Sequence, residues 1–251
     1  MADGVIRTAA KVLYTRPGLL GFPLLGLAAY AVVLTVAVSL PLHGAWERLR
    51  AGHHLTPGDA TVLGAVLVVL ACVNTYVSAS LQHSVHRLLD GSREPLRVSL
   101  AAAGRRLPVL TAWTLLAAVL GSMLRVLENT AGLSVVFELL GLSWSLLTFF
   151  AVPVLVLEGA GLVSGLRRSL VLGRRQVGRW VTGTLRVWIT TILVGLAALA
   201  ALVLAVETDD PAVMAAVAAG VVLLLLLTGL CQAAATATYR VALYRRAVAG
   251  D

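Results

Sequence analysis

The sequence predicts an all-α protein that is embedded in a membrane. Hydrophobic residues make up 59% of the chain and charged residues only 13%, against roughly half and a quarter in an ordinary soluble domain, so the apolar excess requires lipid. Apolar stretches of spanning length recur along the chain, whereas a cleaved signal peptide would be a single short one. None of the stretches alternates polar and apolar residues as the strands of a membrane barrel do. The predicted class is a polytopic helical membrane protein.

Six transmembrane helices are expected. A helix that rises about 1.5 Å per residue needs roughly 20 residues to cross a hydrocarbon core of about 30 Å. The stretches that meet this length are residues 17–40, 60–84, 107–127, 135–157, 180–206 and 212–239. In the fourth, Pro153 lacks a backbone donor and is expected to kink the helix.

Basic residues predict the orientation of these spans. They gather before the first span, between spans two and three, between spans four and five, and after the sixth, while the opposite loops carry only Arg48, Arg50 and Arg125. The positive-inside rule therefore places both termini in the cytoplasm. The formal charge of +8 is attributed to contact with anionic headgroups, because the chain has no aromatic-and-basic motif for nucleic acid.

Three basic segments have the pattern of amphipathic helices that lie in the membrane interface. Leucines and alanines of residues 96–107 oppose Arg97 and Arg105, those of residues 162–177 oppose a second arginine group, and residues 6–14 are similar. The candidate headgroup-binding residues are Arg105, Arg106, Arg167, Arg168, Arg174 and Arg175.

The two longer amphipathic segments also suggest an internal repeat. Ser99 and Leu100 align with Ser169 and Leu170 at a spacing of 70 residues. This predicts three units at residues 4–90, 92–158 and 160–246, each with an interfacial helix followed by two spans. The match of the first unit is weaker, so a repeat of two units is the alternative.

A resemblance to a known family rests on two segments, SLAAAGRRLPVLTAWTLL at residues 99–116 and LSWSLLTFFAVPVLVLEGAGLVSGLRRSLVLGRR at residues 142–175. They resemble an uncharacterised family, a domain of unknown function, of six-span membrane proteins commonest in actinobacteria. More distantly, the pattern is similar to the membrane domain of bacterial glycerophosphodiester phosphodiesterases, whose soluble catalytic domain has no counterpart here. The resemblance implies the architecture and no activity.

Polar side chains inside the spans are the better leads to a site, because an unpaired polar group in hydrocarbon costs several kcal/mol. The expected intramembrane polar residues are Asn74, Gln82, Arg186 and Gln232. Arg186 is expected either to pair with Glu158 at the end of span four or to extend unaided to the interface.

His83 and His86 lie three residues apart on one face of a helix. They are expected either to ligate a metal or relay a proton, or to sit at the headgroup level and bind water. No carboxylate is placed to complete a metal site, so neither a metal nor another cofactor is expected. Together with Glu158, the two histidines are the only catalytic candidates.

Three classes of function remain open. The favoured one is a noncatalytic membrane protein that binds lipid or a partner protein at the cytoplasmic membrane, since no nucleotide-binding, zinc-protease, hydrolase or diphosphate-binding motif occurs. The second is a small transporter or permease-like subunit, indicated by the repeats and the broken fourth span. The third is a membrane-embedded enzyme acting on a lipid or isoprenoid. The expected partners are membrane lipids and either a membrane protein or a second copy of the chain, not nucleic acid.

Overall fold

The structure, a computed structural model, describes residues 17–39, 42–50, 54, 56–92, 94–131, 148–208 and 211–249. Some side chains within these ranges, chiefly those of residues 174–188, are not described. The regular structure of the described ranges is entirely helical, which confirms the predicted all-α class. The predicted interfacial helix at residues 6–14 lies outside the described residues.

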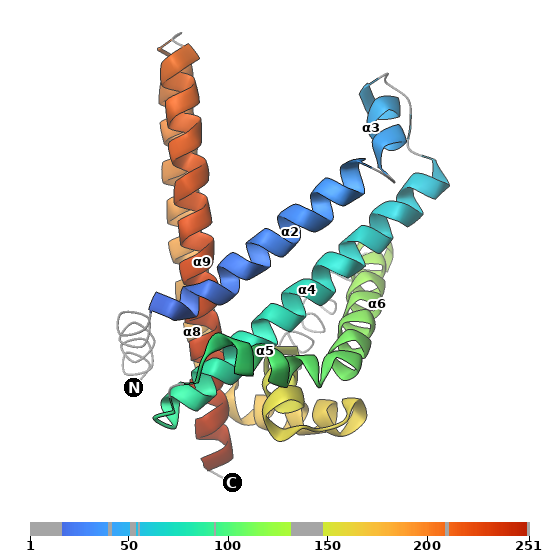
Figure 1. Ribbon diagram of the computed structural model, residues 1–251, viewed down its shortest axis with the longest axis vertical. Helices are drawn as coiled ribbons and strands as arrows, with labels where there is room; N and C mark the ends of the chain where they lie inside the picture. Colours follow the sequence, from blue (N-terminus) through green and yellow to red (C-terminus); the bar gives the residue numbers. More distant parts are fainter. Residues whose placement is uncertain are drawn as a thin grey trace.

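The first half of the chain forms a helical layer. Its elements are η1 (Pro17–Leu20), α2 (Gly21–Ser39), α3 (His43–Arg50), α4 (Pro57–Leu89), α5 (Leu96–Gly104) and α6 (Leu107–Ala131). Helices α2 and α4 run side by side, α5 crosses near the C-terminal end of α4, and α6 packs on α4 from another side (Figure 1). Gly26 permits the close approach of α2 to α4, because a side chain there would meet Val77 at 3.3 Å.

Caps determine where α4 begins and ends. Thr56 and Asp59 form a capping box, in which the Asp59 amide donates to Thr56 Oγ1 at 3.2 Å and the Thr56 amide donates to Asp59 Oδ2 at 2.8 Å. Arg48 of α3 also donates to Asp59, which ties the two helices together. At the other end Gly91 adopts a φ of 80°, which favours glycine and stops the helix.

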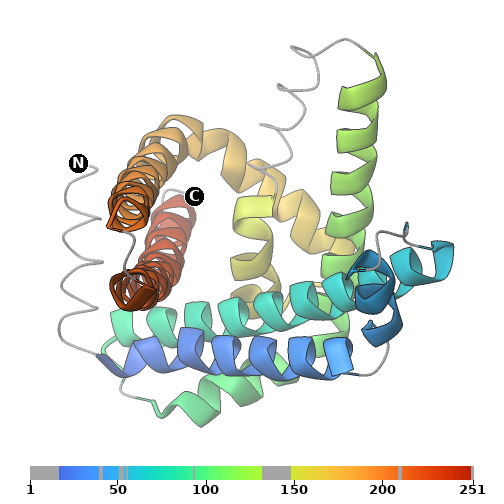
Figure 2. The same ribbon diagram turned by 90° about the horizontal axis from the view of Figure 1, so that it is seen from above.

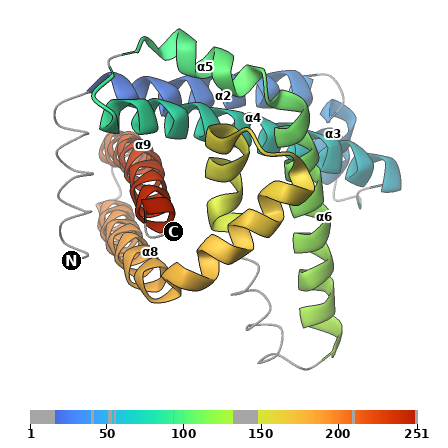
Figure 3. The same ribbon diagram turned by 90° about the horizontal axis from the view of Figure 1, so that it is seen from below.

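The second half of the chain forms a long hairpin. After the short helix Thr148–Glu158 come α8 (Leu162–Val206) and α9 (Pro211–Ala249), which pack against each other along much of their length (Figure 1). Helix α8 contains 45 residues, about 68 Å at 1.5 Å per residue, more than twice the hydrocarbon core of about 30 Å. Its first part lies across the end of the bundle and then curves to run beside α9 (Figure 3).

The helix Thr148–Glu158 occupies the centre of the molecule. Viewed from above, it lies between the α8–α9 pair and α6 (Figure 2). Phe149, Phe150 and Val154 pack in one cluster with α8 and α9, while Val152 and Leu155 pack in another with α4 and α6. A helix that is apolar on all sides must be buried on all sides, and this one is.

The end of the central helix contains the backbone irregularity that Pro153 predicts. Because Pro153 has no amide proton, the helix loses one hydrogen bond and widens into the π-helical turn η2 (Val154–Glu158). Gly159 then adopts a φ of 66° and ends the helix. Gly165 of α8 packs on Leu155 so closely that a side chain would come within 2.6 Å of it. The small residues after Glu158 therefore allow close helix contact.

Four helices are long and apolar enough to cross a membrane: Gly18–Ser39, Pro57–Leu89, Leu107–Leu124 and Ala212–Ala249. Two shorter apolar helices, Thr148–Glu158 and Thr191–Ala205, fall in the predicted fourth and fifth spans. Part of the predicted fourth span, residues 135–147, lies outside the described residues. The described helices are thus compatible with a membrane protein and show four of the six expected spans at full length.

The expected apolar stripes of the amphipathic helices are partly buried. In α5 Ser99 and Ala103 are buried and Leu100 packs against the core, while Leu96 is exposed. In α8 Ser169 is fully buried and Leu166 packs against the core, while Leu170 remains 41% exposed. Small residues let these helices approach their neighbours closely, and acyl chains would cover the leucines that stay exposed.

Candidate functional site

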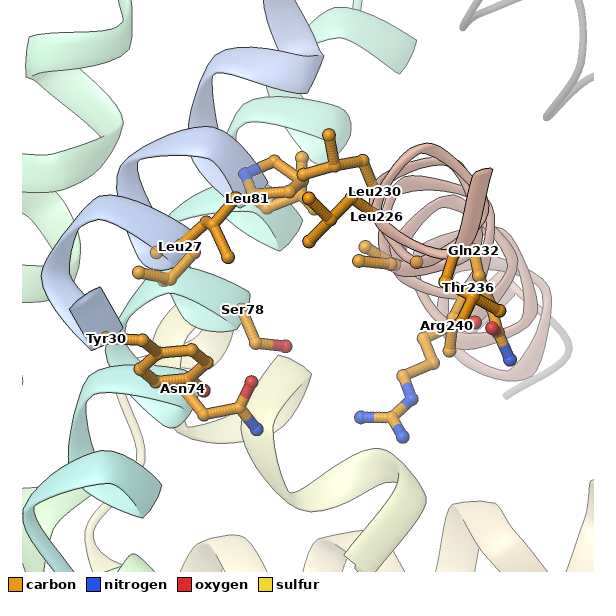
Figure 4. A pocket seen from close by; sticks show the side chains of 17 residues that line it. Leu27, Tyr30, Asn74, Ser78, Leu81, Leu226, Leu230, Gln232, Thr236 and Arg240 are labelled. Carbon is orange, nitrogen blue, oxygen red and sulfur yellow. The ribbon is translucent and has the colours of Figure 1, made fainter. Parts of the chain in front are cut away.

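A cavity of about 470 Å³ opens between α2, α4 and α9 (Figure 4); we call it the central cavity. Its polar lining residues are Tyr30 of α2, Asn74 and Ser78 of α4, and Gln232, Thr236 and Arg240 of α9. Leucines and smaller apolar residues of the same three helices line the rest of the wall. Among the described residues that line it, Arg240 is the only charged one.

Helical periodicity brings these polar groups together. On α4, Asn74 and Ser78 are four residues apart, and on α9, Gln232, Thr236 and Arg240 follow one another at the same spacing. Residues four apart share one face of a helix. The sequence predictions include Asn74 and Gln232, but they omit the other four polar residues, although the repeated spacing of four was visible in the sequence.

Arg240 is the unusual member of the site. Its Nε atom is buried and has no hydrogen-bond partner, and its guanidinium carbon lies 5.0 Å from the centre of the Phe149 ring. Within the described part of the chain no carboxylate pairs with it. A cation over an aromatic face gains about 0.5–2 kcal/mol, whereas an ion in a low-dielectric interior loses several kcal/mol of solvation. The cation is therefore only partly compensated.

Gln82 lies outside the central cavity and is hydrogen-bonded to Ser78, which lines it. It is fully buried, and its Nε2 donates to Ser78 Oγ at 3.0 Å. Because Ser78 accepts this bond, its own hydroxyl proton remains available to an acceptor. The predicted intramembrane residue Gln82 therefore positions a side chain of the cavity and does not line the cavity itself.

The two histidines engage different partners. His83 Nδ1 lies 3.2 Å from the Oγ of Ser99 on α5. His86 Nε2 lies 3.6 Å from Asp90, and Asp90 also forms an ion pair with Arg245 of α9, with 2.8 Å between Oδ1 and Nη2. Across the described residues no three His, Cys, Asp or Glu side chains are grouped to hold a metal.

Glu158, the last residue of the helix Thr148–Glu158, contacts a side chain of α9 and a side chain of α8. It accepts a hydrogen bond of 2.9 Å from the Tyr244 hydroxyl, and its Oε1 lies 3.5 Å from Arg168 Nε. The alternative pair with Arg186 falls on a side chain that is not described. No contact within the described ranges joins Glu158 to either histidine, so the three catalytic candidates do not form one site there.

The predicted headgroup-binding arginines have varied surroundings. Arg105 and Arg167 are exposed. Arg106 lies directly against Gly159, where no space remains for a side chain on that glycine, and Arg168 lies near Glu158. The side chains of Arg174 and Arg175 are outside the described set. Headgroup binding by these residues stays a prediction.

Glu94 lies in the loop between α4 and α5. Arg87 Nε donates to Glu94 Oε1 at 2.8 Å, and this hydrogen bond, together with the positive charge of the guanidinium, holds the pKa of Glu94 below its usual range. Glu94 is therefore ionised at neutral pH and neutralises Arg87.

The long apolar helices around the central cavity are compatible with a membrane protein. Residues 59–251 match a family of unknown function, DUF6159, and the chain belongs to this family. Comparison with curated proteins and with solved structures gives no match. The predicted uncharacterised family agrees with this result, while the similarity to glycerophosphodiester phosphodiesterases and the actinobacterial link receive no support from it.

Proposed function

We propose that this chain is a noncatalytic six-span protein of the bacterial cytoplasmic membrane, with both termini in the cytoplasm, which binds an anionic lipid in the central cavity. The observation that carries the proposal is the buried guanidinium of Arg240, which lacks an acidic partner in the described residues and faces the cavity (Figure 4). A lipid phosphate would supply the missing negative charge.

The order of side chains along α9 favours a lipid over a small anion. Leu225, Leu226 and Leu230 line the cavity farther from the C-terminal end of α9, and Thr236 and Arg240 line it nearer to that end. An acyl chain fits against the leucines while the headgroup lies at the arginine. Sites for small molecules combine apolar walls with a few polar groups that fix orientation in the same way.

The arrangement of basic elements supports the proposed orientation. Helix α5, the first part of α8 and the C-terminal end of α9 lie at the same end of the molecule (Figure 1). These elements carry Arg97, Arg105, Arg167 and Arg246, as expected for the face toward anionic cytoplasmic headgroups. The second part of α8, beside α9, is long enough to be the fifth span. Association with a partner protein or a second copy of the chain stays a prediction.

Lipid retention tests the proposal. Native mass spectrometry of the purified protein should show a bound anionic phospholipid, and Arg240→Gln should reduce its occupancy. A hydrogen bond to a charged group is worth about 1.5–3 kcal/mol, so the affinity should fall about tenfold or more. Arg246→Gln, which changes an exposed arginine outside the cavity, is the matched control and should retain the lipid. Equal retention by both variants would refute the site.

A transporter is the second candidate, and one contact favours it. Phe149, which stacks on Arg240, belongs to the helix that contains Pro153 and the π-helical turn, and broken helices line the substrate sites of many transporters. Reconstituted liposomes with a fluorescent anionic lipid in one leaflet would distinguish the two functions. Movement of the lipid to the other leaflet that depends on Arg240 supports transport, whereas retention without movement supports binding alone.

A further inference from the structure

We propose that a groove between α4 and α5 is a second anion site, which binds a phosphate group at the basic end of the molecule. The groove has a volume of about 670 Å³ and is lined by His83 and Arg87 of α4, Glu94 of the connecting loop, Arg97 of α5, and Arg105 directly after α5. Among the described residues it shares no lining residue with the central cavity, and the proposal does not rest on lipid binding there.

The groove carries an excess of positive charge. Arg87 and Glu94 neutralise each other through their hydrogen-bonded pair. Arg97 and Arg105, by contrast, have no acidic partner among the residues that the structure describes. Glu94 is not free to compensate them, because one of its oxygens is taken by Arg87 and the other is buried without a hydrogen bond. These two arginines therefore lack a counter-ion.

The spacing of these arginines suits one anion between them. Arg97 and Arg105 are two helical turns apart, so their backbones are separated by about 12 Å along the axis, a gap that two long side chains can close from either end. Between them on the groove wall lie Val98, Ala101 and Ala102, and the small side chains of the two alanines leave space beside the arginines. Guanidinium groups bind phosphate oxygens through paired hydrogen bonds.

His83 provides a third donor. Its Nδ1 lies 3.2 Å from the hydroxyl of Ser99, and Ser99 is only 1% exposed. When the hydroxyl donates to Nδ1, the neutral imidazole carries its proton on Nε2 and donates from there. Ser99 is thus a positioning residue that sets the tautomer, and the histidine that lines the groove offers an N–H to an anion.

Two sources could supply the phosphate group, and both present the same chemistry: a lipid headgroup that ends in a phosphate, or a soluble phosphate ester. Two titrations distinguish them. The full chain in phosphatidylcholine nanodiscs is titrated with inorganic phosphate and glycerol 3-phosphate by calorimetry. In parallel, binding to nanodiscs that contain phosphatidic acid is measured by native mass spectrometry, with phosphatidylcholine nanodiscs as the reference.

The double variant Arg97→Gln/Arg105→Gln should weaken phosphate binding at least tenfold, and Ser99→Ala should weaken it a few-fold while leaving both arginines in place. Arg246→Gln controls for a general loss of positive charge and should bind as the unaltered protein does. In the calorimetric titrations with the soluble probes, Arg240→Gln should leave binding unchanged. For phosphatidic acid, the double variant is compared with the unaltered groove in an Arg240→Gln background, so that lipid in the central cavity is not counted.

Saturable binding of the soluble probes supports a phosphate ester as the source, and binding seen only with phosphatidic acid supports a headgroup. The proposal is overturned if neither probe binds, or if the double variant binds as tightly as the unaltered protein. A circular dichroism spectrum and a melting curve for each variant verify folding. A loss of binding counts only for a variant that is folded.

Discussion

Filling the central cavity from α9 gives a sharp test of whether a ligand occupies it. Gly229 lines the cavity, and no heavy atom lies within 4 Å of the position that a Cβ would take. Gly229→Phe therefore adds a ring without a clash in the ligand-free protein. Gly220 lies on the same helix with the same open surroundings but does not line the cavity, so Gly220→Phe is the matched control.

The two substitutions should affect the fold equally and the ligand differently. Each removes a helical glycine, which gains a few tenths of a kcal/mol in helix propensity. In the filled cavity the new ring competes with the ligand, and forcing extra carbon atoms into an occupied space costs about 1–3 kcal/mol. The affinity for the anionic lipid should therefore fall about 5- to 150-fold for Gly229→Phe and remain unchanged for Gly220→Phe.

Thermal unfolding with added anionic lipid measures this difference. At a lipid concentration 100 times the dissociation constant, binding stabilises the unaltered protein by about 2.7 kcal/mol. A 50-fold loss of affinity reduces that stabilisation to about 0.6 kcal/mol at the same concentration. The reasoning fails if Gly229→Phe retains the full stabilisation, because the ligand would then lie elsewhere, or if both variants lose it.

Three further outcomes are expected. In intact cells a cysteine at Thr208 should react with an impermeant reagent and one at Ala249 should not; the reverse pattern would invert the proposed orientation. Gly159→Ala should lower the free energy of unfolding by about 1–2 kcal/mol, because a φ of 66° disfavours a side chain, and the guanidinium of Arg106 would have to move. Gly161→Ala, at a φ of −71°, should cost far less, and melting curves of the two variants measure the difference. Since the folded-state pKa of Glu94 is depressed, its contribution to stability is present above its ordinary pKa of about 4.3 and is lost as the pH falls through the folded value. Melting curves between pH 7 and pH 3 should show this loss, and Glu94→Gln should remove that part of the pH dependence.

Hydropathy predicts where several helices begin and end. The expected third span and α6 both begin at Leu107, the fifth span and α8 both end at Val206, and α9 begins one residue before the expected sixth span. These limits are predictable because a turn or a proline interrupts the apolar run there. The other ends of α4 and α9 extend past the apolar stretches, since arginine and histidine end a span without ending a helix.

The continuity of α8 was not predicted. The sequence indicated an interfacial helix at residues 162–177 and a separate span at residues 180–206, whereas the backbone of Leu162–Val206 is helical throughout and changes direction by curving (Figure 3). No proline lies in this stretch, so nothing removes the hydrogen bonds that continue the helix. Ser99 and Ser169, which the proposed repeat aligns, are both buried; this agrees with a repeat but does not establish one.

The central cavity was only partly predictable. Asn74 and Gln232 stand out in sequence because they are polar in apolar surroundings. Their convergence with Arg240 depends on the crossing of α4 and α9, which is set by contacts between residues far apart in the chain. The sequence pattern of one helix predicts on which face a residue lies, but it does not predict which other helix packs against that face.

Two turns near the C-terminal end of α9 hold several parts of the molecule together. Arg240 and Tyr244 contact the central helix Thr148–Glu158, and Arg245 binds Asp90 at the end of α4. A chain cut after residue 239 would keep all six expected spans and lose all three contacts. Truncated forms designed by counting spans should therefore reach the membrane but fail to assemble, and a purification tag belongs after Ala249, separated from the helix by a linker.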